Sequence, residues 1–382
     1  MRIIALLILL LFQYQNMFSQ EKEKNILNSE SPKYKEEDYL TLIKKYSIDV
    51  LDYEEYEISI VTNIAADSNG NLYVVSIMDS KIFVFDSLGN FKKELGRPGQ
   101  GPRELERPYS IALTDNKIYV YERNKGVKIW DAEGKYLDYF LFPFSKRLPN
   151  FYPYPDHYLV SYFEYEGNPA ETGKWISHFY YSKFDLELNK ISDINKIIID
   201  EHKVASYHPT DIIAIDSENN IYTPVSPEIY RINKYNKDGD FLFSFGREYK
   251  SKKYSKKIRD WYYNKFTKML RQLRPTEYAT PVELKGNPPI VRHLMVDSRD
   301  NIWVVVGEWH GDNTRNYAIV STVDIFSKRG DFLFTFETDK ITPKSFIKNN
   351  LLYCSPRGLL FRNEGEDSNL NVYNIHYKKT PG

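Results

Sequence analysis

The sequence has little of what several protein classes require. Its 382 residues contain one cysteine, Cys354, which excludes an internal disulfide and a cysteine-rich zinc site. The 52 basic and 52 acidic residues balance, and no nucleic-acid recognition motif is present. The seven histidines show no His-x-x-x-His spacing, and no Gly-x-Ser-x-Gly nucleophile motif occurs. We therefore expect neither a disulfide scaffold nor a nucleic-acid partner.

Long apolar runs are also missing, apart from one at the N-terminus. Residues 3–12 form an unbroken apolar run after Arg2, and a more polar stretch follows up to Ser19. A run of about ten apolar residues is too short to span a bilayer and is typical of a secretory signal peptide. We predict a signal peptide over residues 1–19, with an uncleaved anchor as the alternative. The mature chain is then exported, periplasmic or extracellular, and has no transmembrane span.

Aromatic residues and a repeated hairpin pattern are what the sequence has in quantity. Its 32 tyrosines and 22 phenylalanines favour strands. Residues 64–75 (IAADSNGNLYVV) and 81–92 (KIFVFDSLGNFK) each place a turn of Asp, Asn, Ser and Gly between two apolar segments. This arrangement is typical of β-hairpins. Similar stretches begin at Ile111, Ile213 and Leu294, and weaker copies fill the gaps.

The repeat predicts a β-propeller. Its turns recur about every 50 residues, and four-stranded units of this period bury their faces only against neighbours, so they close into a ring. We predict an all-β, six-bladed β-propeller of four-stranded antiparallel blades over residues 49–382, after a polar lead-in over residues 20–48. The sixth unit ends after three strands, so we expect residues 53–61 to supply its outermost strand.

An insertion at about residues 247–290 interrupts the repeat between units four and five. Apolar residues between positions 258 and 273 fall at spacings of three and four, which predicts a helix. Residues 247–274 contain eleven basic and two acidic residues. We expect this helix to pack over an acidic propeller face. The alternative is contact of the segment from Lys250 to Arg274 with an anionic surface, such as lipid headgroups or an acidic glycan.

The connection between the first two units carries a family resemblance. Residues 91–105, FKKELGRPGQGPREL, contain Gly-x-x-Gly-x-Gly-Pro-x-Glu-Leu. Together with the hairpins, this stretch resembles the NHL repeat and related bacterial six-bladed β-propeller proteins, over roughly residues 50–376. The sequence departs from the pattern in unit three, where Leu188 replaces the turn glycine, and in the insertion. The resemblance implies the fold but not the function, because the same scaffold carries binding modules, lactonases and lyases.

The glycines of this connection do not form a nucleotide-binding loop, because no helical period follows them. An arginine follows the turn twice, at Arg97 and at Arg247 after Phe245-Gly246. Each guanidinium could bind neighbouring turn carbonyls or, together with Arg103, contact a ligand at the rim. The Asp-rich turn at residues 297–301 resembles a calcium loop. It lacks the glycine at position six and the terminal glutamate, so we expect a hairpin turn.

The leading functional hypothesis is an exported, non-enzymatic binding or scaffold propeller that recognises a protein, peptide or glycan at one rim and the channel mouth. No catalytic residue and no cofactor are assigned. Tyrosine and arginine combine contact area with directional donors. The candidate ligand-binding residues are Tyr109, Arg97, Arg123, Asp211, Arg292 and His293.

The alternative is an enzyme at the channel mouth. Asp211 and His293 lie close to the start of expected innermost strands and could hold a divalent metal such as calcium or zinc. The protein would then be a metal-assisted lactonase or lyase, gluconolactonase-like or amidating-lyase-like. For His293 the competing interpretation is a partly buried histidine that hydrogen-bonds to the backbone.

Overall fold

The computed structural model describes most of the chain between residues 25 and 378. The signal peptide, Asp211 and almost all of the expected insertion helix lie outside the described residues, so these expectations stay predictions. The described residues are 25–34, 39–50, 58–114, 116–123, 125–141, 150–166, 176–200, 212–250, 253, 256, 259–260, 289–310, 320–341, 345–355 and 369–378.

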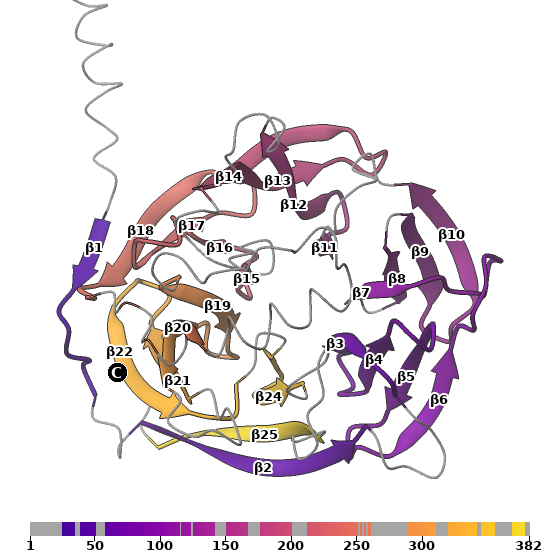
Figure 1. The fold of residues 1–382 in the computed structure, drawn as a ribbon, viewed down its shortest axis with the longest axis horizontal. Coiled ribbons are helices and arrows are strands. Elements are labelled where there is room, and N and C mark those ends of the chain that lie inside the picture. Colours follow the sequence, from indigo (N-terminus) through magenta and orange to yellow (C-terminus); the bar gives the residue numbers. More distant parts are fainter. Residues whose placement is uncertain are drawn as a thin grey trace, which may run out of the picture.

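Six antiparallel sheets form a ring around a central axis (Figure 1). Each has four antiparallel strands, and in blades one to five these follow one another outward in chain order. The six-bladed all-β propeller is therefore confirmed. The innermost strands are β3 (Val61–Ala66), β7 (Pro108–Leu113), β11 (Asn150–Pro153), β15 (Ala214–Ile215), β19 (Val291–Val296) and β23 (Phe346–Lys348).

The remaining strands complete each blade toward the rim. The second strands are β4 (Leu72–Ser76), β8 (Lys117–Glu122), β12 (Tyr158–Glu166), β16 (Ile221–Pro224), β20 (Ile302–His310) and β24 (Leu351–Cys354). The third strands are β5 (Lys81–Phe85), β9 (Gly126–Asp131), β13 (Ile176–Phe184), β17 (Arg231–Tyr235), β21 (Val320–Phe326) and β25 (Asn369–Tyr377). The outermost strands are β6 (Phe91–Leu95), β10 (Tyr136–Leu141), β14 (Lys190–Asp200), β18 (Phe241–Arg247), β22 (Phe332–Thr338) and β2 (Leu40–Asp49).

The repeated Asp-rich turns are hairpins built by their own side chains. Oδ1 of Asp67 accepts hydrogen bonds from the backbone N–H groups of Asn69 and Asn71, at 2.9 and 2.8 Å. The Asn71 amide donates to Oδ2 of Asp67 at 2.7 Å. Asp297 and Asn301 make the same contacts between β19 and β20, which confirms the hairpin interpretation of that turn. The carboxylate thus satisfies turn donors that a strand ladder cannot reach.

The ring is closed by an N-terminal strand, but by a different segment from the one expected. β2 pairs antiparallel with β25, from Leu40 opposite Tyr377 to Asp49 opposite Asn369. The assignment of this strand to residues 53–61 is therefore wrong. Of the residues expected to form this strand, 58–60 lie outside any strand, and Val61 begins β3, the innermost strand of blade one.

Before β2, the chain runs along the rim of two other blades. β1 (Asn25–Asn28) adds a parallel fifth strand to β18 of blade four. The N–H groups of Lys33 and Tyr34 then donate to carbonyls of β22 in blade five, at 3.1 and 2.9 Å. We call the described residues of this segment, 25–34 and 39–49, the N-terminal belt. It follows the outside of blades four, five and six (Figure 1).

Asn28 fastens the N-terminal belt to two blades at once. Its Nδ2 donates to the carbonyls of Gly246 and Gly330, at 2.8 and 2.9 Å, and its Oδ1 accepts from the N–H of Phe332 at 3.0 Å. The polar lead-in expected over residues 20–48 is therefore corrected for the described residues. These residues are held by hydrogen bonds to distant strands, which their polar composition does not reveal.

The hydrophobic core lies mainly between neighbouring blades. Between blades one and two, Tyr73 and Val75 of β4 pack with Ile118 of β8 and Trp130 of β9, and none is more than 5% exposed. Burying a side chain of this size stabilises a fold by about 1.5–3 kcal/mol. Because the single cysteine forms no disulfide, these interfaces carry much of the ring's cohesion.

Candidate functional site

The topology places the loops of the propeller on two opposite faces. In an antiparallel blade the first and third strands run one way and the second and fourth return. The starts of the innermost strands, the turns between second and third strands, and the connections between blades therefore share one face. We call it the connection face; it includes residues 96–107, 123 and 125. The opposite turn face carries the Asp-rich hairpins, such as residues 216–220 and 297–301.

The five described candidate residues all lie on the connection face. Arg97 lies in the connection between β6 and β7, Tyr109 is the second residue of β7, and Arg123 lies in the turn between β8 and β9. Arg292 and His293 are at the start of β19. Blades two and five lie across the ring from each other, so these residues form two separate groups (Figure 1). Asp211 lies outside the described residues.

Two of the candidates occupy equivalent irregularities of the innermost strands. The register shifts by one residue at Tyr109 in β7 and at Arg292 in β19, as it does at Thr62 in β3. Such a β-bulge turns a side chain out of the ladder and is common beside functional sites. Next to Arg292, a Cβ on Gly307 would come within 2.9 Å of the arginine side chain, so the glycine leaves space for it.

His293 is engaged by the backbone of the next blade. Its Nε2 lies 2.5 Å from the carbonyl oxygen of Ser345, which is a hydrogen bond when Nε2 carries the proton. Ser345 is buried, at 2% exposed. This contact matches the interpretation of His293 as a histidine satisfied by the backbone. Within the described residues, no three His, Cys, Asp or Glu side chains are placed to hold a metal together.

The connection from blade one to blade two is a compact loop, residues 96–107. The Leu105 N–H donates to the Arg97 carbonyl at 2.7 Å, and the Gly99 N–H donates back to the Leu105 carbonyl at 3.1 Å. From β9, Lys128 Nζ donates to the carbonyls of Gly101 and Glu104, at 3.1 and 2.5 Å. The loop is therefore fixed from inside by a buried ammonium group.

Each glutamate of this region is used within the loop or by the turn beside it. Glu104 accepts from the Gly101 N–H at 2.8 Å and pairs with Arg97 at 3.0 Å. Both contacts lower the pKa of the Glu104 carboxyl, the backbone N–H most strongly. Glu106 forms an ion pair with Lys125, which lowers the pKa of the Glu106 carboxyl.

The third carboxylate, Glu122, is buried and joins the turn to the loop. Its Oε2 lies 3.2 Å from Lys128 Nζ, and its Oε1 accepts from the Glu106 N–H at 2.5 Å. The N–H of Arg123 also donates to the carbonyl of Arg107 at 3.1 Å. The loop and the turn between β8 and β9 are therefore tied together by hydrogen bonds, and we call their described residues, 96–107, 122–123 and 125–128, the arginine platform.

Three arginines of the arginine platform remain available to solvent. Arg103, Arg107 and Arg123 are exposed, and within the described part of the chain their side chains make no hydrogen bond or ion pair. Arg97 differs, because Glu104 already binds it. The acids of the platform are all paired with lysine, Arg97 or backbone N–H groups, so none of them forms an ion pair with these three guanidinium groups; only Glu106 feels the charge of Arg107.

Arg107 has an unusual backbone. Its φ is +56°, in the left-handed region that favours glycine, and it directly precedes Pro108. Residues before proline normally take extended conformations, so this conformation costs ~1–3 kcal/mol. Sequence reasoning considered Arg103 as a rim contact but missed Arg107. An arginine next to a proline inside a glycine-rich connection was the available signal, but the sequence does not reveal φ.

The second arginine that follows a turn glycine is structural. Arg247 Nε lies 2.7 Å from Oδ2 of the fully buried Asp324, and its guanidinium lies over the rings of Tyr230 and Tyr249, each at 5.3 Å. It also donates to the Glu248 carbonyl at 3.1 Å. Arg247 therefore joins blade four to blade five and is not offered to a ligand.

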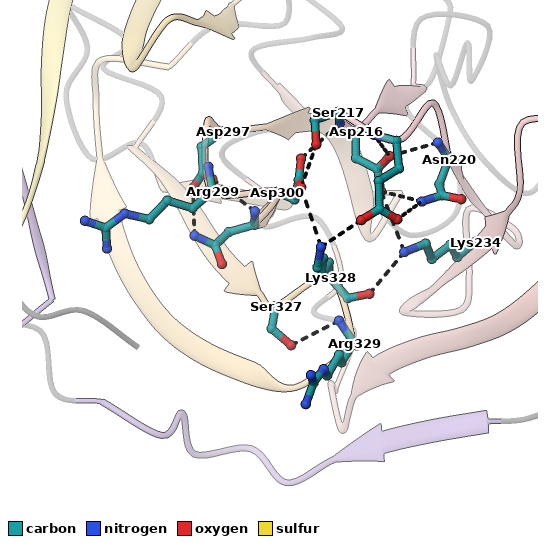
Figure 2. A network of polar contacts seen from close by, with 12 residues as sticks. Asp216, Ser217, Asn220, Lys234, Asp297, Arg299, Asp300, Ser327, Lys328 and Arg329 are labelled. Atoms are coloured by element: carbon teal, nitrogen blue, oxygen red, sulfur yellow. Dashed lines mark hydrogen bonds and ion pairs between the residues drawn. The ribbon is translucent and has the colours of Figure 1, made fainter. Parts of the chain in front are cut away.

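The turn face has a denser polar network between the same two blades (Figure 2). Ser217 donates through its backbone N–H and its hydroxyl to Asp300, at 2.9 and 2.8 Å. Lys328 binds Glu218 at 2.9 Å, which lowers the pKa of the Glu218 carboxyl. Arg329 at the tip of its hairpin points away from this network (Figure 2). Because the charges of the network satisfy one another, it holds the blades together and leaves few groups for a partner.

With this geometry in place, the sequence matches the family described as a 6-bladed beta-propeller, DUF5128, over residues 15–284. The chain belongs to this family. A comparison with curated proteins gives no match. No helix in the described part of this propeller is long and apolar enough to cross a membrane.

Solved structures similar to this propeller include two proteins from Bacteroides species. One is from Bacteroides fragilis and is named as an exported protein; it is 14% identical with a TM-score of 0.50, and the match covers 93% of this chain and 99% of that one. The other is a member of the DUF4221 family from Bacteroides vulgatus, 11% identical with a TM-score of 0.53, covering 90% and 100%. Identities this low show a shared fold alone.

Proposed function

We propose that this chain is an exported, non-enzymatic binding propeller that holds a protein, peptide or glycan on its connection face. The observation that supports this is the arginine platform, where three exposed guanidinium groups lie on a loop whose acids are all paired internally. Rigid loops that present arginine make strong binding anchors, because little conformational freedom is lost on binding. The turn face, by contrast, uses its charges between blades.

Two finer assignments accompany this proposal. The signal-peptide-like residues 1–19 and the exported description of the Bacteroides fragilis structure support export to the periplasm or the cell exterior. The glycine-rich connection and the Asp-rich hairpins support a relationship to NHL repeats. The basic insertion, from Lys250 to Arg274, stays a candidate for salt-sensitive contact with an anionic surface.

The enzyme alternative has no observation in its favour within the described residues. His293 is held by the Ser345 carbonyl, and its proposed partner Asp211 lies outside them. Catalysis with a divalent metal such as calcium or zinc therefore stays a prediction. Metal analysis of the purified chain, repeated after His293→Ala, would test it directly.

The binding proposal can be tested by cross-linking from one face at a time. Cys354 is buried, so a single introduced cysteine can be labelled with a photo-crosslinker. We would label Arg123→Cys on the connection face and Arg329→Cys on the turn face, then irradiate each in extracts of the native cell envelope. We expect a higher-mass adduct from position 123, as a discrete band for a protein or peptide partner and a broad one for a glycan, and no adduct from position 329. Equal adducts from both positions, or an adduct from position 329 alone, would refute the proposal.

A further inference from the structure

The exposed arginines of the arginine platform come from two loops that are hydrogen-bonded to each other. Arg103 directly precedes Glu104, whose carbonyl is held by Lys128, and Arg107 is hydrogen-bonded through its carbonyl to the N–H of Arg123. They come from two loops, yet backbone and side-chain hydrogen bonds connect these loops. A ligand that binds across these two loops therefore meets a surface that carries three exposed arginines.

The chemistry of these side chains favours a carboxylate partner. A guanidinium group is planar and donates two parallel hydrogen bonds to a carboxylate, whereas an ammonium group acts as a point charge. The lysines of the platform, Lys125 and Lys128, are both used internally. The positively charged side chains of the platform that remain for a partner are thus all arginines.

The backbone of the platform argues against an extended peptide. Peptides that bind by adding a strand need free main-chain donors and acceptors on the host. Here the N–H groups of Gly99, Gly101, Glu104, Leu105 and Glu106 are already bound within the platform. A polysaccharide does not need such pairing, since its hydroxyl groups can stay solvated while its carboxylates bind.

The strained conformation of Arg107 is a second, independent observation. Glycine would suit its φ of +56° without strain, but the chain carries an arginine whose side chain is exposed. Strain that the surrounding structure maintains is common at ligand-binding positions. The chain therefore keeps an exposed arginine at a strained position, and the carbonyl of this arginine accepts the Arg123 N–H.

We propose that Arg103, Arg107 and Arg123 bind the carboxylates of an acidic polysaccharide, a polyuronate chain, across the arginine platform. This inference rests on the proposed function and names the partner class for the same face. Arg97 supports the site indirectly, because its pairing with Glu104 holds the loop. Successive uronate units would present carboxylates along the chain to the three arginines.

The test uses the full chain and polygalacturonate as the probe, with affinity measured by calorimetry at low and at high salt. An exposed charge pair accounts for a few-fold in affinity, so we expect the triple variant Arg103→Gln, Arg107→Gln, Arg123→Gln to bind about 10- to 100-fold more weakly. Arg329→Gln, an exposed arginine on the turn face, is the matched control and should leave affinity unchanged. A triple Arg→Lys variant should recover only part of the affinity, because it keeps charge without the planar fork.

Arg107→Gly separates binding from folding. It removes the guanidinium and relieves the strained φ, so we expect weaker binding together with a higher unfolding temperature. Wild-type affinity in this variant would overturn the role of Arg107. A loss of both binding and thermal stability would show that the residue acts by holding the fold, which also contradicts the proposal.

The choice of polymer decides between sources of the carboxylate. Fully methyl-esterified polygalacturonate should not bind, and dextran sulfate should bind more weakly than polygalacturonate. Poly-glutamate binding as tightly as polygalacturonate would replace the polysaccharide by an acidic peptide and overturn the inference. If polygalacturonate fails to bind while position 123 still cross-links a partner, this inference fails and the proposed function stands. If both experiments fail, both are refuted.

Discussion

The contact that best tests the N-terminal belt is the side chain of Asn28. It makes three hydrogen bonds, to the carbonyls of Gly246 and Gly330 and from the N–H of Phe332, and thereby joins β1, blade four and blade five. A hydrogen bond contributes about 0.5–1.5 kcal/mol net, and Asn28 is half-buried, so water replaces part of what is lost. We therefore expect Asn28→Ala to lower the free energy of unfolding by about 2 kcal/mol.

Urea denaturation and thermal unfolding both measure this change. For a ring of this size, about 2 kcal/mol corresponds to a drop of roughly 3 °C in the unfolding temperature. Ser29→Ala is the matched control, since the exposed Ser29 hydroxyl donates only to the Ser31 carbonyl next to it, at 3.2 Å. If the two variants differ by less than ~0.5 kcal/mol, Asn28 does not fasten the belt.

Asn28→Asp refines the same test. It keeps the acceptor oxygen but turns a carboxylate toward the two glycine carbonyls that the amide bound. Near neutral pH we expect a greater loss than for Asn28→Ala. In the folded protein this carboxyl has a raised pKa, so stability should recover as the pH falls and the acid becomes a donor again. A loss independent of pH would contradict this reasoning.

Three further predictions concern the seam between blades four and five. Gly330→Ala should lower the free energy of unfolding by about 1–3 kcal/mol, because φ is +89° at this position and a Cβ would lie 2.8 Å from a neighbouring side-chain carbon. An unchanged midpoint of urea denaturation would contradict this prediction. Asp324→Ala should lower the free energy of unfolding by about 3–5 kcal/mol, because it leaves the Arg247 guanidinium without its carboxylate partner. Adding Arg247→Met should restore part of this free energy, and a double variant less stable than Asp324→Ala would contradict the prediction. Lys328→Met should reduce stability at neutral pH only. The pKa of Glu218 is lowered below its usual 4.5, so the contribution of the ion pair is present above pH 4.5 and is lost as the pH falls through the folded pKa; a difference that persists at pH 2 would refute this.

The blades could be predicted from the sequence because their turns are local. Asp67 and Asn71 close a hairpin with contacts that span five residues, and the same letters return wherever the hairpin does. Leu188 shows that the place of a residue in the turn matters more than its type, since Leu188 takes a φ of +67° where other units use glycine. The hairpin pattern therefore identified unit three even without its glycine.

The closing strand could not be identified in the same way. Residues 40–49 (LTLIKKYSID) and 53–61 (YEEYEISIV) both mix apolar and polar side chains, and the second segment alternates more regularly. What decides between them is pairing with β25, more than 300 residues away in the chain. Asn28 is similar, because its partners at Gly246 and Gly330 are 218 and 302 residues distant. A local sequence pattern cannot predict contacts between residues this far apart in the chain.

The candidate site was predictable as a face but not as a set of contacts. The place of Arg97, Tyr109 and Arg123 within the repeat is enough to assign them to the connection face. The pairing of Arg97 with Glu104 and the left-handed φ of Arg107 depend on how the connection folds over Lys128. The sequence thus predicted which loop matters. The structure distinguishes Arg97, which pairs with Glu104 and supports the loop, from the exposed arginines that could contact a ligand.

The way the ring closes also determines when folding can be completed. β2 and its partner β25 are more than 300 residues apart in the chain, so during synthesis their pairing waits until β25 has been made. Until then Leu40 and Ile48, buried in the finished ring, lack the strand that helps to cover them. Non-local pairing of this kind slows folding. A chain interrupted before Asn369 would have every described strand of blades one to five but would lack the partner of β2, so the N-terminal belt could not fasten the ring.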